Sequence, residues 1–172
     1  KVKLGTASEA LCLMRVPGTD NRSSGVAGCE NANTFARGSD VAQVVAEAFL
    51  QASRLADISL QNAGGVRIAI PAGEINNGRA RELLPFSNTL VEMKLTGQQL
   101  INALEDGVAT GSGAHPYAAG MRWNLDLSKA KGQRISAVEV KNRSTGVWSA
   151  INLTQTYTLV TNDFIASGRD GY

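Results

Sequence analysis

Two of the four phenylalanines in this sequence lie on polar bends, where a large apolar ring does little for a core. Phe86 precedes Asn88 by two residues, and Phe164 precedes Asp170 by six residues in a glycine-rich turn. A ring face can stack on a nucleobase for roughly 1–3 kcal/mol, and a carboxylate can accept hydrogen bonds from a base or sugar. These residue types favour a site for a flat heteroaromatic ligand. The alternative is that both rings fill the core and that Asp170 only stabilises its own turn.

The stretch LQNAGGVR contributes a third group of polar side chains. Asn62 follows a predicted strand, and the adjacent Gly64 and Gly65 allow the backbone to approach a ligand closely. Arg67 then presents a planar guanidinium that is always charged. Taken alone, this stretch is also an ordinary turn. Together with the two phenylalanine bends, it predicts a pocket that holds a flat ring and an anionic or carbonyl edge.

Motifs for several other kinds of chemistry are missing from the sequence. It contains no GxxxxGK[ST] phosphate loop, no GxGxxG and no GxSxG. Its single histidine, His115, lies in the loop GSGAHPYAAG. We interpret His115 as a solvated side chain, because histidine catalysis normally needs an orienting partner. Since a catalytic metal ion needs several His and Asp ligands, we expect neither a catalytic residue nor a metal site in this chain.

Size and charge narrow the class of protein further. A chain of 172 residues with 43% hydrophobic residues suits one globular domain. A net charge of +2 without a long basic run argues against a nucleic acid polymer as partner. No apolar stretch approaches the ~20 residues needed to span a bilayer, so we expect no membrane span. We expect a piece of a larger protein rather than a processed one, because the predicted functional turn runs straight into Tyr172.

The two cysteines, Cys12 and Cys29, both lie in a polar, glycine-rich segment rather than in a predicted core. One interpretation is a disulfide between them in an oxidising compartment, which would contribute roughly 3 kcal/mol on the chain-entropy model. The alternative is a pair of unrelated free thiols. Zinc binding is disfavoured because the chain has one histidine and no Cys-x-x-Cys.

Two amphipathic helices are expected to support these residues. The first covers residues 39–57, with Ser39 as N-cap. Its apolar stripe comprises Val41, Val44, Val45, Ala48, Phe49 and Leu55. The second starts with a capping box formed by Thr96 and Gln99, and Gly107 suits its end.

The remaining elements indicate an α+β fold. Strands are predicted within residues 58–70 (two strands around a glycine turn), 89–95, 121–127, 134–151 (a hairpin) and 156–161. The later strands follow one another without crossover helices, which favours antiparallel or mixed sheets with flanking helices. Residues 1–38 are rich in turn formers and are expected to form an irregular segment that packs on a domain of residues 39–172.

Four stretches, taken in order, resemble the C-terminal domain of the 5'-nucleotidase family, which includes periplasmic UDP-sugar hydrolases. They are NAGGVR, LLPFSNTLVEMKLTGQQL, GSGAHPYAAGMRW and YTLVTNDFIASGRDGY. The resemblance extends over residues ~39–172 and is loose over residues 1–38. It implies the layered α+β architecture of that domain, with residues 39–172 as its substrate-binding unit.

The resemblance also implies a division of labour between two domains. In the family, an N-terminal metallophosphatase domain holds two divalent metal ions, and the C-terminal domain binds the nucleoside and presents the phosphate by an interdomain rotation. This chain looks like the second domain only, so by itself it is expected to be inactive and to hold no cofactor. The implied partners are a nucleotide or nucleoside and the metallophosphatase domain of the same protein. The implied localisation is periplasmic or extracellular.

Site residues follow from the same resemblance, position by position. Phe86 and Phe164 match the two rings that sandwich the base, Asn88 matches a base contact, and Asp170 matches the acid that contacts the ribose hydroxyls.

The other matches concern the substrate's remaining groups and the pocket wall. Arg67 matches an arginine that reaches the substrate, Asn62 is expected to shape or line the pocket, and Gly113 is a candidate backbone contact. A further substrate arginine of the family's N-terminal part has three candidates here: Arg15, Arg22 and Arg37.

One position departs from the family pattern. The family usually ends this motif Gly-Gly-Asp-Gly-Tyr, whereas this chain has Arg169 in place of the second glycine. If that position needs a positive φ, arginine costs on the order of 1 kcal/mol there. Otherwise the added cation makes a dinucleotide or nucleotide sugar as reasonable a substrate as AMP. Two further alternatives are a non-catalytic binding or adhesion module that kept the fold, and a relative that acts on a non-nucleotide ester.

Overall fold

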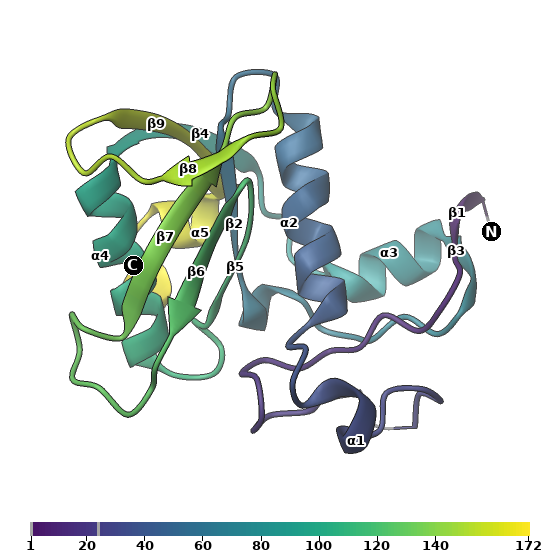
Figure 1. Cartoon of the computed structure of the whole chain (residues 1–172). Helices are drawn as coiled ribbons and strands as arrows, with labels where there is room; N and C mark the ends of the chain where they lie inside the picture. The colour runs from purple at the N-terminus through teal and green to yellow at the C-terminus, as the bar shows by residue number, and fades with distance from the viewer. Residues whose placement is uncertain (1, 24) are drawn as a thin grey trace.

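A four-stranded mixed sheet lies at the centre of the computed structural model, which describes residues 2–23 and 25–172. Its strand order is β4-β9-β2-β5, and their bounds are Leu90–Thr96, Thr156–Asn162, Ile58–Asn62 and Pro116–Ala119. Strands β2 and β9 run parallel, while β4–β9 and β2–β5 are antiparallel. This arrangement agrees with the predicted α+β class with mixed sheets (Figure 1).

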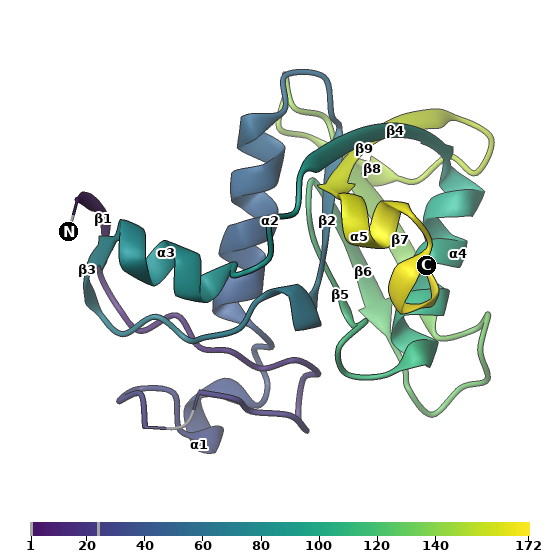
Figure 2. The same cartoon turned by 180° about the vertical axis from the view of Figure 1, so that it is seen from behind.

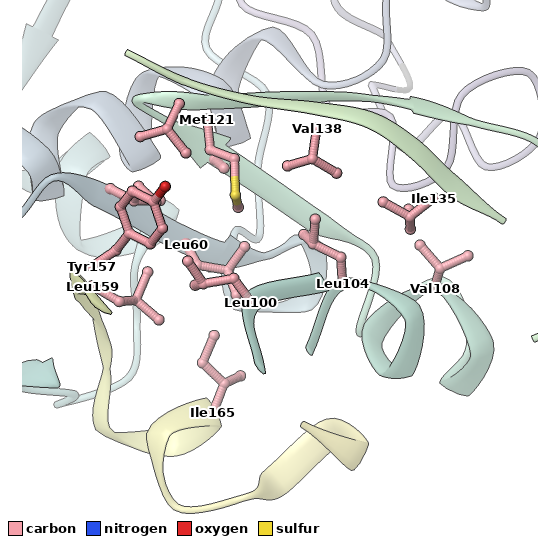
Figure 3. Close-up of a cluster of buried hydrophobic side chains, with 13 residues drawn as sticks. Leu60, Leu100, Leu104, Val108, Met121, Ile135, Val138, Tyr157, Leu159 and Ile165 are labelled. Carbon is pink, nitrogen blue, oxygen red and sulfur yellow. The ribbon is translucent and has the colours of Figure 1, made fainter. Parts of the chain in front are cut away.

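A second, antiparallel sheet shares the main hydrophobic core cluster with the first. Its three strands are β6 (Met121–Leu125), β7 (Ile135–Lys141) and β8 (Trp148–Ala150), and the β7–β8 hairpin confirms the predicted one. Helix α4 (Gly97–Thr110) packs on β4, β5 and β7, and its apolar side chains join the main core cluster. Figure 3 shows Leu100 and Leu104 of this helix beside Leu60 and Val138 from the two sheets.

Both predicted helix starts have the expected caps. Helix α2 (Asp40–Ala52) begins where the Ser39 hydroxyl accepts a hydrogen bond from the Ala42 amide at 3.1 Å. Helix α4 begins with a complete capping box: Thr96 Oγ1 accepts from the Gln99 amide, and Gln99 Oε1 accepts from the Thr96 amide. These bonds satisfy amides that have no partner inside the helix.

The predicted helices are wrong in two details. Helix α2 ends at Ala52, and its buried positions are Val41, Ala42, Val45 and Ala46, so Val44 and Leu55 are exposed. Helix α4 continues past Gly107 to Thr110. Gly107 faces the Tyr172 ring, and a Cβ there would lie 2.5 Å from the tyrosine oxygen. Close packing, rather than helix termination, explains this glycine.

The segment predicted to be irregular contains two regular elements. Strand β1 (Lys3–Ala7) pairs with β3 (Gly73–Asn76), and a short helix, α1, covers Asn31–Thr34. Strand β3 leads into helix α3 (Asn77–Leu83). Residues 66–70, predicted as a strand, form only one isolated bridge, between Ile70 and Leu11. Figures 1 and 2 show α2 between this part of the chain and the two larger sheets.

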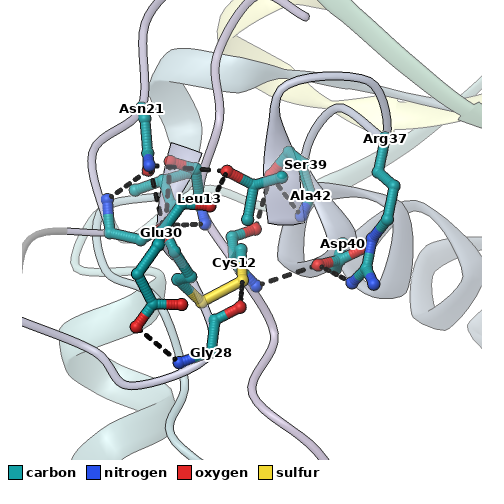
Figure 4. Close-up of polar contacts among 12 residues, drawn as sticks. Cys12, Leu13, Asn21, Gly28, Glu30, Arg37, Ser39, Asp40 and Ala42 are labelled. Atoms are coloured by element: carbon teal, nitrogen blue, oxygen red, sulfur yellow. Dashed lines mark hydrogen bonds and ion pairs between the residues drawn. A yellow bond between two sulfur atoms is a disulfide. The ribbon is translucent and has the colours of Figure 1, made fainter. Parts of the chain in front are cut away.

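Cys12 and Cys29 form a disulfide, so the alternative of two free thiols is wrong. The Cys12 amide donates to Asp40 Oδ2 at 3.2 Å, and the same oxygen accepts from Arg37 at 2.7 Å (Figure 4). Ser23 also bonds Leu13 through both its donor and its acceptor. The loop between the cysteines is therefore fixed against the start of α2 by covalent and polar contacts. Within residues 2–23 and 25–172, none of the helices combines the length and apolar character that a membrane crossing requires.

His115 is not the solvated side chain that its loop position suggested. It is 5% exposed, and its ring meets Tyr117 edge-on at 5.6 Å. Burial lowers the pKa of the imidazole from its ordinary value of 6.5 to about 4. The folded protein thus holds a neutral histidine at neutral pH.

This burial predicts a loss of stability in acid. Between pH 6.5 and pH 4 the unfolded chain binds a proton at this position while the folded chain does not. The free energy of unfolding therefore has its full value above pH 6.5, and it falls by roughly 3 kcal/mol as the pH drops toward 4. Urea unfolding at several pH values should show this slope, and His115→Gln should remove it relative to the parent. An unchanged slope in the variant would contradict a buried neutral imidazole.

Candidate functional site

One pocket of 280 Å³ gathers all seven residues that the resemblance matched to the substrate site, from Asn62 to Asp170. Its walls comprise Asn62, Arg67, Phe86, Asn88, Gly113, Phe164 and Asp170, together with Arg15, Gly64 and Gly65. The residues come from five separate segments of the chain. Their convergence is a property of the fold, because no two of these segments are adjacent in sequence.

The sheet explains where the pocket forms. Because β2 and β9 are parallel, their carboxyl ends meet at the same edge, with Asn62 ending one strand and Asn162 ending the other. Each strand continues directly into a short helix, η1 (Ala63–Gly65) and α5 (Asp163–Ala166). Side chains at such an edge are well placed to meet a ligand.

The two phenyl rings have different surroundings. Phe86 lies on the bend between α3 and β4 and is 51% exposed, so it is not a core residue. Phe164 lies in α5, is partly buried and packs against the main core cluster. Asn88 is exposed beside Phe86. The alternative that both rings fill the hydrophobic core is therefore wrong for Phe86 and holds only in part for Phe164.

An arginine accompanies each ring. The guanidinium of Arg67 lies 5.8 Å from the centroid of Phe86, and that of Arg169 lies 5.7 Å from the centroid of Phe164. Arg67 also donates to the Gly64 carbonyl at 3.2 Å. At an exposed site, a contact of this kind attracts a guanidinium to the ring face by about 0.5–1 kcal/mol.

Of the three candidate N-terminal arginines, Arg15 is the one that lines the pocket. Its Nε is buried and has no hydrogen-bond partner among the described residues. Burial first, and then the charges of Arg22 and Arg67, lower the pKa of this guanidinium. Arg22 pairs with Asp20 at 3.1 Å, and Arg37 pairs with Asp40. A buried donor without an acceptor is costly unless a ligand or water supplies one.

The acid of the pocket is held in an unusual backbone conformation. Asp170 lies in η2 (Arg169–Gly171) at a φ of 57°, and its Oδ2 accepts a hydrogen bond from Asn62 Nδ2 at 2.8 Å. The positive φ falls on Asp170 and not on Arg169, so the strain considered for the arginine is absent. Aspartate tolerates the left-handed region better than most residues do.

Sequence reasoning missed two buried amides behind Asn62. Asn162 Nδ2 donates to Gln61 Oε1 and to Asn62 Oδ1, both at 3.1 Å. All three side chains are at most 3% exposed. The signal available in the sequence was an asparagine at the end of each of two predicted strands.

Contacts within the chain explain why residues 64 and 65 are both glycine. The Gly64 amide donates to the Gly113 carbonyl at 2.7 Å, and a Cβ on Gly64 would lie 2.9 Å from that oxygen. A Cβ on Gly65 would lie 2.3 Å from Gln61 Nε2 and 2.9 Å from Asn62 Oδ1. The GG pair therefore leaves room for another backbone segment and for the buried amides.

A pocket of aromatic, amide and arginine side chains at the carboxyl edge of an α+β sheet is typical of domains that bind small ligands. The sequence model of the 5'-nucleotidase C-terminal domain matches residues 16–172. The chain therefore belongs to the family of 5'-nucleotidase C-terminal domains.

Individual relatives agree with this assignment. The chain is 37% identical over 141 residues to the NAD 5'-nucleotidase of Haemophilus influenzae, which covers 78% of this chain and 23% of that protein. It is 40% identical over 122 residues to a probable 5'-nucleotidase of Treponema pallidum, covering 67% of this chain and 20% of that protein. The chain thus spans less than a quarter of the length of these two relatives.

Solved structures resemble this one along nearly the whole chain. The 5'-nucleotidase precursor from Thermus thermophilus has a TM-score of 0.81 at 33% identity and covers 99% of this chain and 31% of its own. The NAD nucleotidase of H. influenzae also has a TM-score of 0.81 at 33% identity, covering 98% and 29%. These likenesses confirm the predicted fold class.

Proposed function

We propose that this domain binds the nucleoside part of a nucleotide for a metal-dependent nucleotidase. The base stacks between Phe86 and Phe164, and Asp170 accepts hydrogen bonds from the ribose. The observation that carries the proposal is the shared pocket: all seven residues chosen from the sequence line it.

The charges around the pocket fit the parts of a nucleotide. The pocket contains two cations, Arg15 and Arg67, and one carboxylate, Asp170. The arginines favour an anionic group of the ligand, and the carboxylate favours a hydrogen-bond donor of the ligand. The donor without a partner, Arg15 Nε, suits a phosphate oxygen. Asn88 can donate to and accept from the edge of a base.

Hydrolysis itself is assigned to another part of the same protein. We place two divalent metal ions in an N-terminal metallophosphatase domain, to which this domain presents the phosphate. The Cys12–Cys29 disulfide supports a periplasmic or extracellular location, because disulfides persist in oxidising compartments. An adhesion or binding module without a catalytic partner is the competing function.

A dinucleotide is a second candidate substrate, favoured by Arg169. Its guanidinium lies beside Phe164 and follows Gly168 at the rim that carries Asp170. A second phosphate group would find an additional cation there. The similar protein from H. influenzae is named as an NAD 5'-nucleotidase.

Titration of the 172-residue chain with adenosine tests the proposal. Ring-proton NMR signals of Phe86 and Phe164 are expected to shift, with a dissociation constant near or above ~1 mM, because two stacks supply at most roughly 2–6 kcal/mol gross. The same sample should not hydrolyse AMP with or without added divalent metal ions. Absence of shifts at high adenosine concentration, both here and in a form that carries a metallophosphatase domain, would overturn the proposal.

Arg15 is expected to distinguish AMP from adenosine. Arg15→Lys keeps a positive charge but removes Nε, so AMP affinity should fall about tenfold, the loss of one charge-assisted hydrogen bond. Adenosine affinity should stay unchanged. Arg37→Lys is the matched control, because Arg37 pairs with Asp40 and does not line the pocket. Equal losses for both ligands would show damage to the pocket rather than a lost phosphate contact.

A further inference from the structure

Asn162 has two hydrogen-bonding roles at the base of the pocket. Its Oδ1 accepts from the Ile165 amide at 3.0 Å and so caps α5, the helix that carries Phe164. Its Nδ2 donates to Gln61 Oε1 and to Asn62 Oδ1. A helix cap needs only the oxygen, and serine or aspartate would provide it equally well. The amide nitrogen therefore requires a separate explanation.

The explanation lies in the orientation of the next side chain. An asparagine amide can face a neighbour with either its oxygen or its nitrogen, and its hydrogen bonds decide which. Because Asn62 Oδ1 accepts from Asn162 Nδ2 at 3.1 Å and from Gln61 Nε2 at 3.4 Å, the Nδ2 of Asn62 is left to face Asp170, and it donates to the carboxylate at 2.8 Å. A reversed Asn62 would turn an oxygen toward that carboxylate and repel it.

The burial of these groups makes the arrangement well defined. Gln61, Asn62 and Asn162 are 1%, 3% and 2% exposed. A buried amide that loses its partner is penalised more than an exposed one, because water cannot replace the bond. The hydrogen bonds thus run from the helix that carries Phe164 to the carboxylate of Asp170 without leaving the protein interior until the last residue.

We propose that Asn162 is a positioning residue that sets the ribose-binding geometry of Asp170 while fixing the helix that carries the base-stacking ring. This inference rests on the proposed function, since it assumes that Asp170 binds the ribose and Phe164 the base. It assigns to Asn162, and to Gln61 behind it, a part in ligand discrimination that neither side chain performs by contact. Neither residue lines the 280 Å³ pocket; both line a neighbouring cavity of 120 Å³ that shares Phe86 and Asn88 with it.

The readout is the ratio of the dissociation constants of 2',3'-dideoxyadenosine and adenosine, measured by NMR titration of the 172-residue chain. The two ligands share the base and differ in the ribose hydroxyls, so the ratio reports contacts to these hydroxyls, which the proposed function assigns to Asp170. In the parent it should be about tenfold, as for one charge-assisted hydrogen bond. Asp170→Asn should reduce it to near one.

Asn162→Asp is the decisive variant. It keeps the cap of α5 but replaces the donor with an acceptor, so Asn62 should rotate and turn its oxygen toward Asp170. The ratio should collapse to near one, while affinity for dideoxyadenosine changes by less than about threefold because the ring stack is kept. Asn162→Ser, which also keeps a capping oxygen but cannot reach both amides, should give a smaller loss and serves if the first variant does not fold.

Asn76→Asp provides the matched control. Asn76 caps α3 through its oxygen, which accepts from the Gly78 and Arg79 amides, and it does not line the pocket. Its ratio should equal that of the parent. If Asp170→Asn collapses the ratio while both Asn162 variants keep it, the positioning role is overturned and the proposed function stands. If Asp170→Asn leaves the ratio unchanged, the ribose contact fails and the inference fails with it.

Discussion

Phe86→Ala is expected to lower adenosine affinity by roughly 5- to 150-fold, the equivalent of one lost stack of about 1–3 kcal/mol. The ring lines the pocket, is 51% exposed and lies on a bend, so its removal leaves little cavity in the core. The free energy of unfolding should accordingly change by less than ~0.5 kcal/mol. A large loss of binding without a loss of stability separates a ligand contact from a packing residue.

The same substitution has a clean control elsewhere in the chain. Phe35 follows α1, is 36% exposed and does not line the pocket, so Phe35→Ala should leave adenosine affinity unchanged. In a form of the protein that hydrolyses AMP, Phe86→Ala should lower kcat/KM, whereas a non-catalytic module predicts no change. Parent-like affinity in Phe86→Ala would remove the base-stacking proposal.

Phe164 needs a milder substitution, because it packs against the core cluster as well as lining the pocket. Deleting its ring would mix a lost stack with a cavity, and the cavity alone destabilises the fold. Asn162 also caps the short helix that carries this ring. The two rings are therefore unequal: one belongs to an exposed bend, and the other to a helix tied into the sheet.

Features that depend on neighbouring residues were predictable from the sequence. The Ser39 cap and the Thr96–Gln99 capping box each join residues three positions apart, so the pattern and the bond are read from the same short stretch. The pocket residues were predictable for another reason. They lie in four sequence stretches that resemble 5'-nucleotidase C-terminal domains and occur in the same order. That match predicted which residues would meet, although no single stretch shows how they meet.

Features that depend on distant partners were not predictable in the same way. Strand β1 is stabilised by β3, about seventy positions later, and it is followed by a segment, residues 15–38, that is rich in turn formers. Gly107 suits a helix end by its sequence position, but Tyr172, sixty-five positions later, packs against it. His115 lies in a polar loop by sequence, but the fold buries it beside Tyr117. The bonds of Asn162 likewise run between side chains of two parallel strands.

Gly65→Ala should damage the pocket from inside the protein. The added Cβ would lie 2.3 Å from Gln61 Nε2 and 2.9 Å from Asn62 Oδ1, well inside any real contact. A flexible surface side chain could swing aside, but Gln61 is 1% exposed and hydrogen-bonded to the Asn62 backbone and to Asn162. Overpacking of this kind typically costs about 1–3 kcal/mol of folding free energy.

Adenosine affinity of the Gly65→Ala variant should fall by more than its loss of folding free energy explains. Displacing Asn62 breaks its bond to Asp170, so adenosine affinity should fall about tenfold in protein that is still folded. Gly5→Ala is the matched control, because a Cβ there meets nothing within 4 Å, and it should leave affinity unchanged. Urea unfolding and adenosine titration of both variants separate the two effects. If Gly65→Ala is as stable and binds as well as the parent, the buried amides have room to move, and they cannot be what holds Asp170 in place.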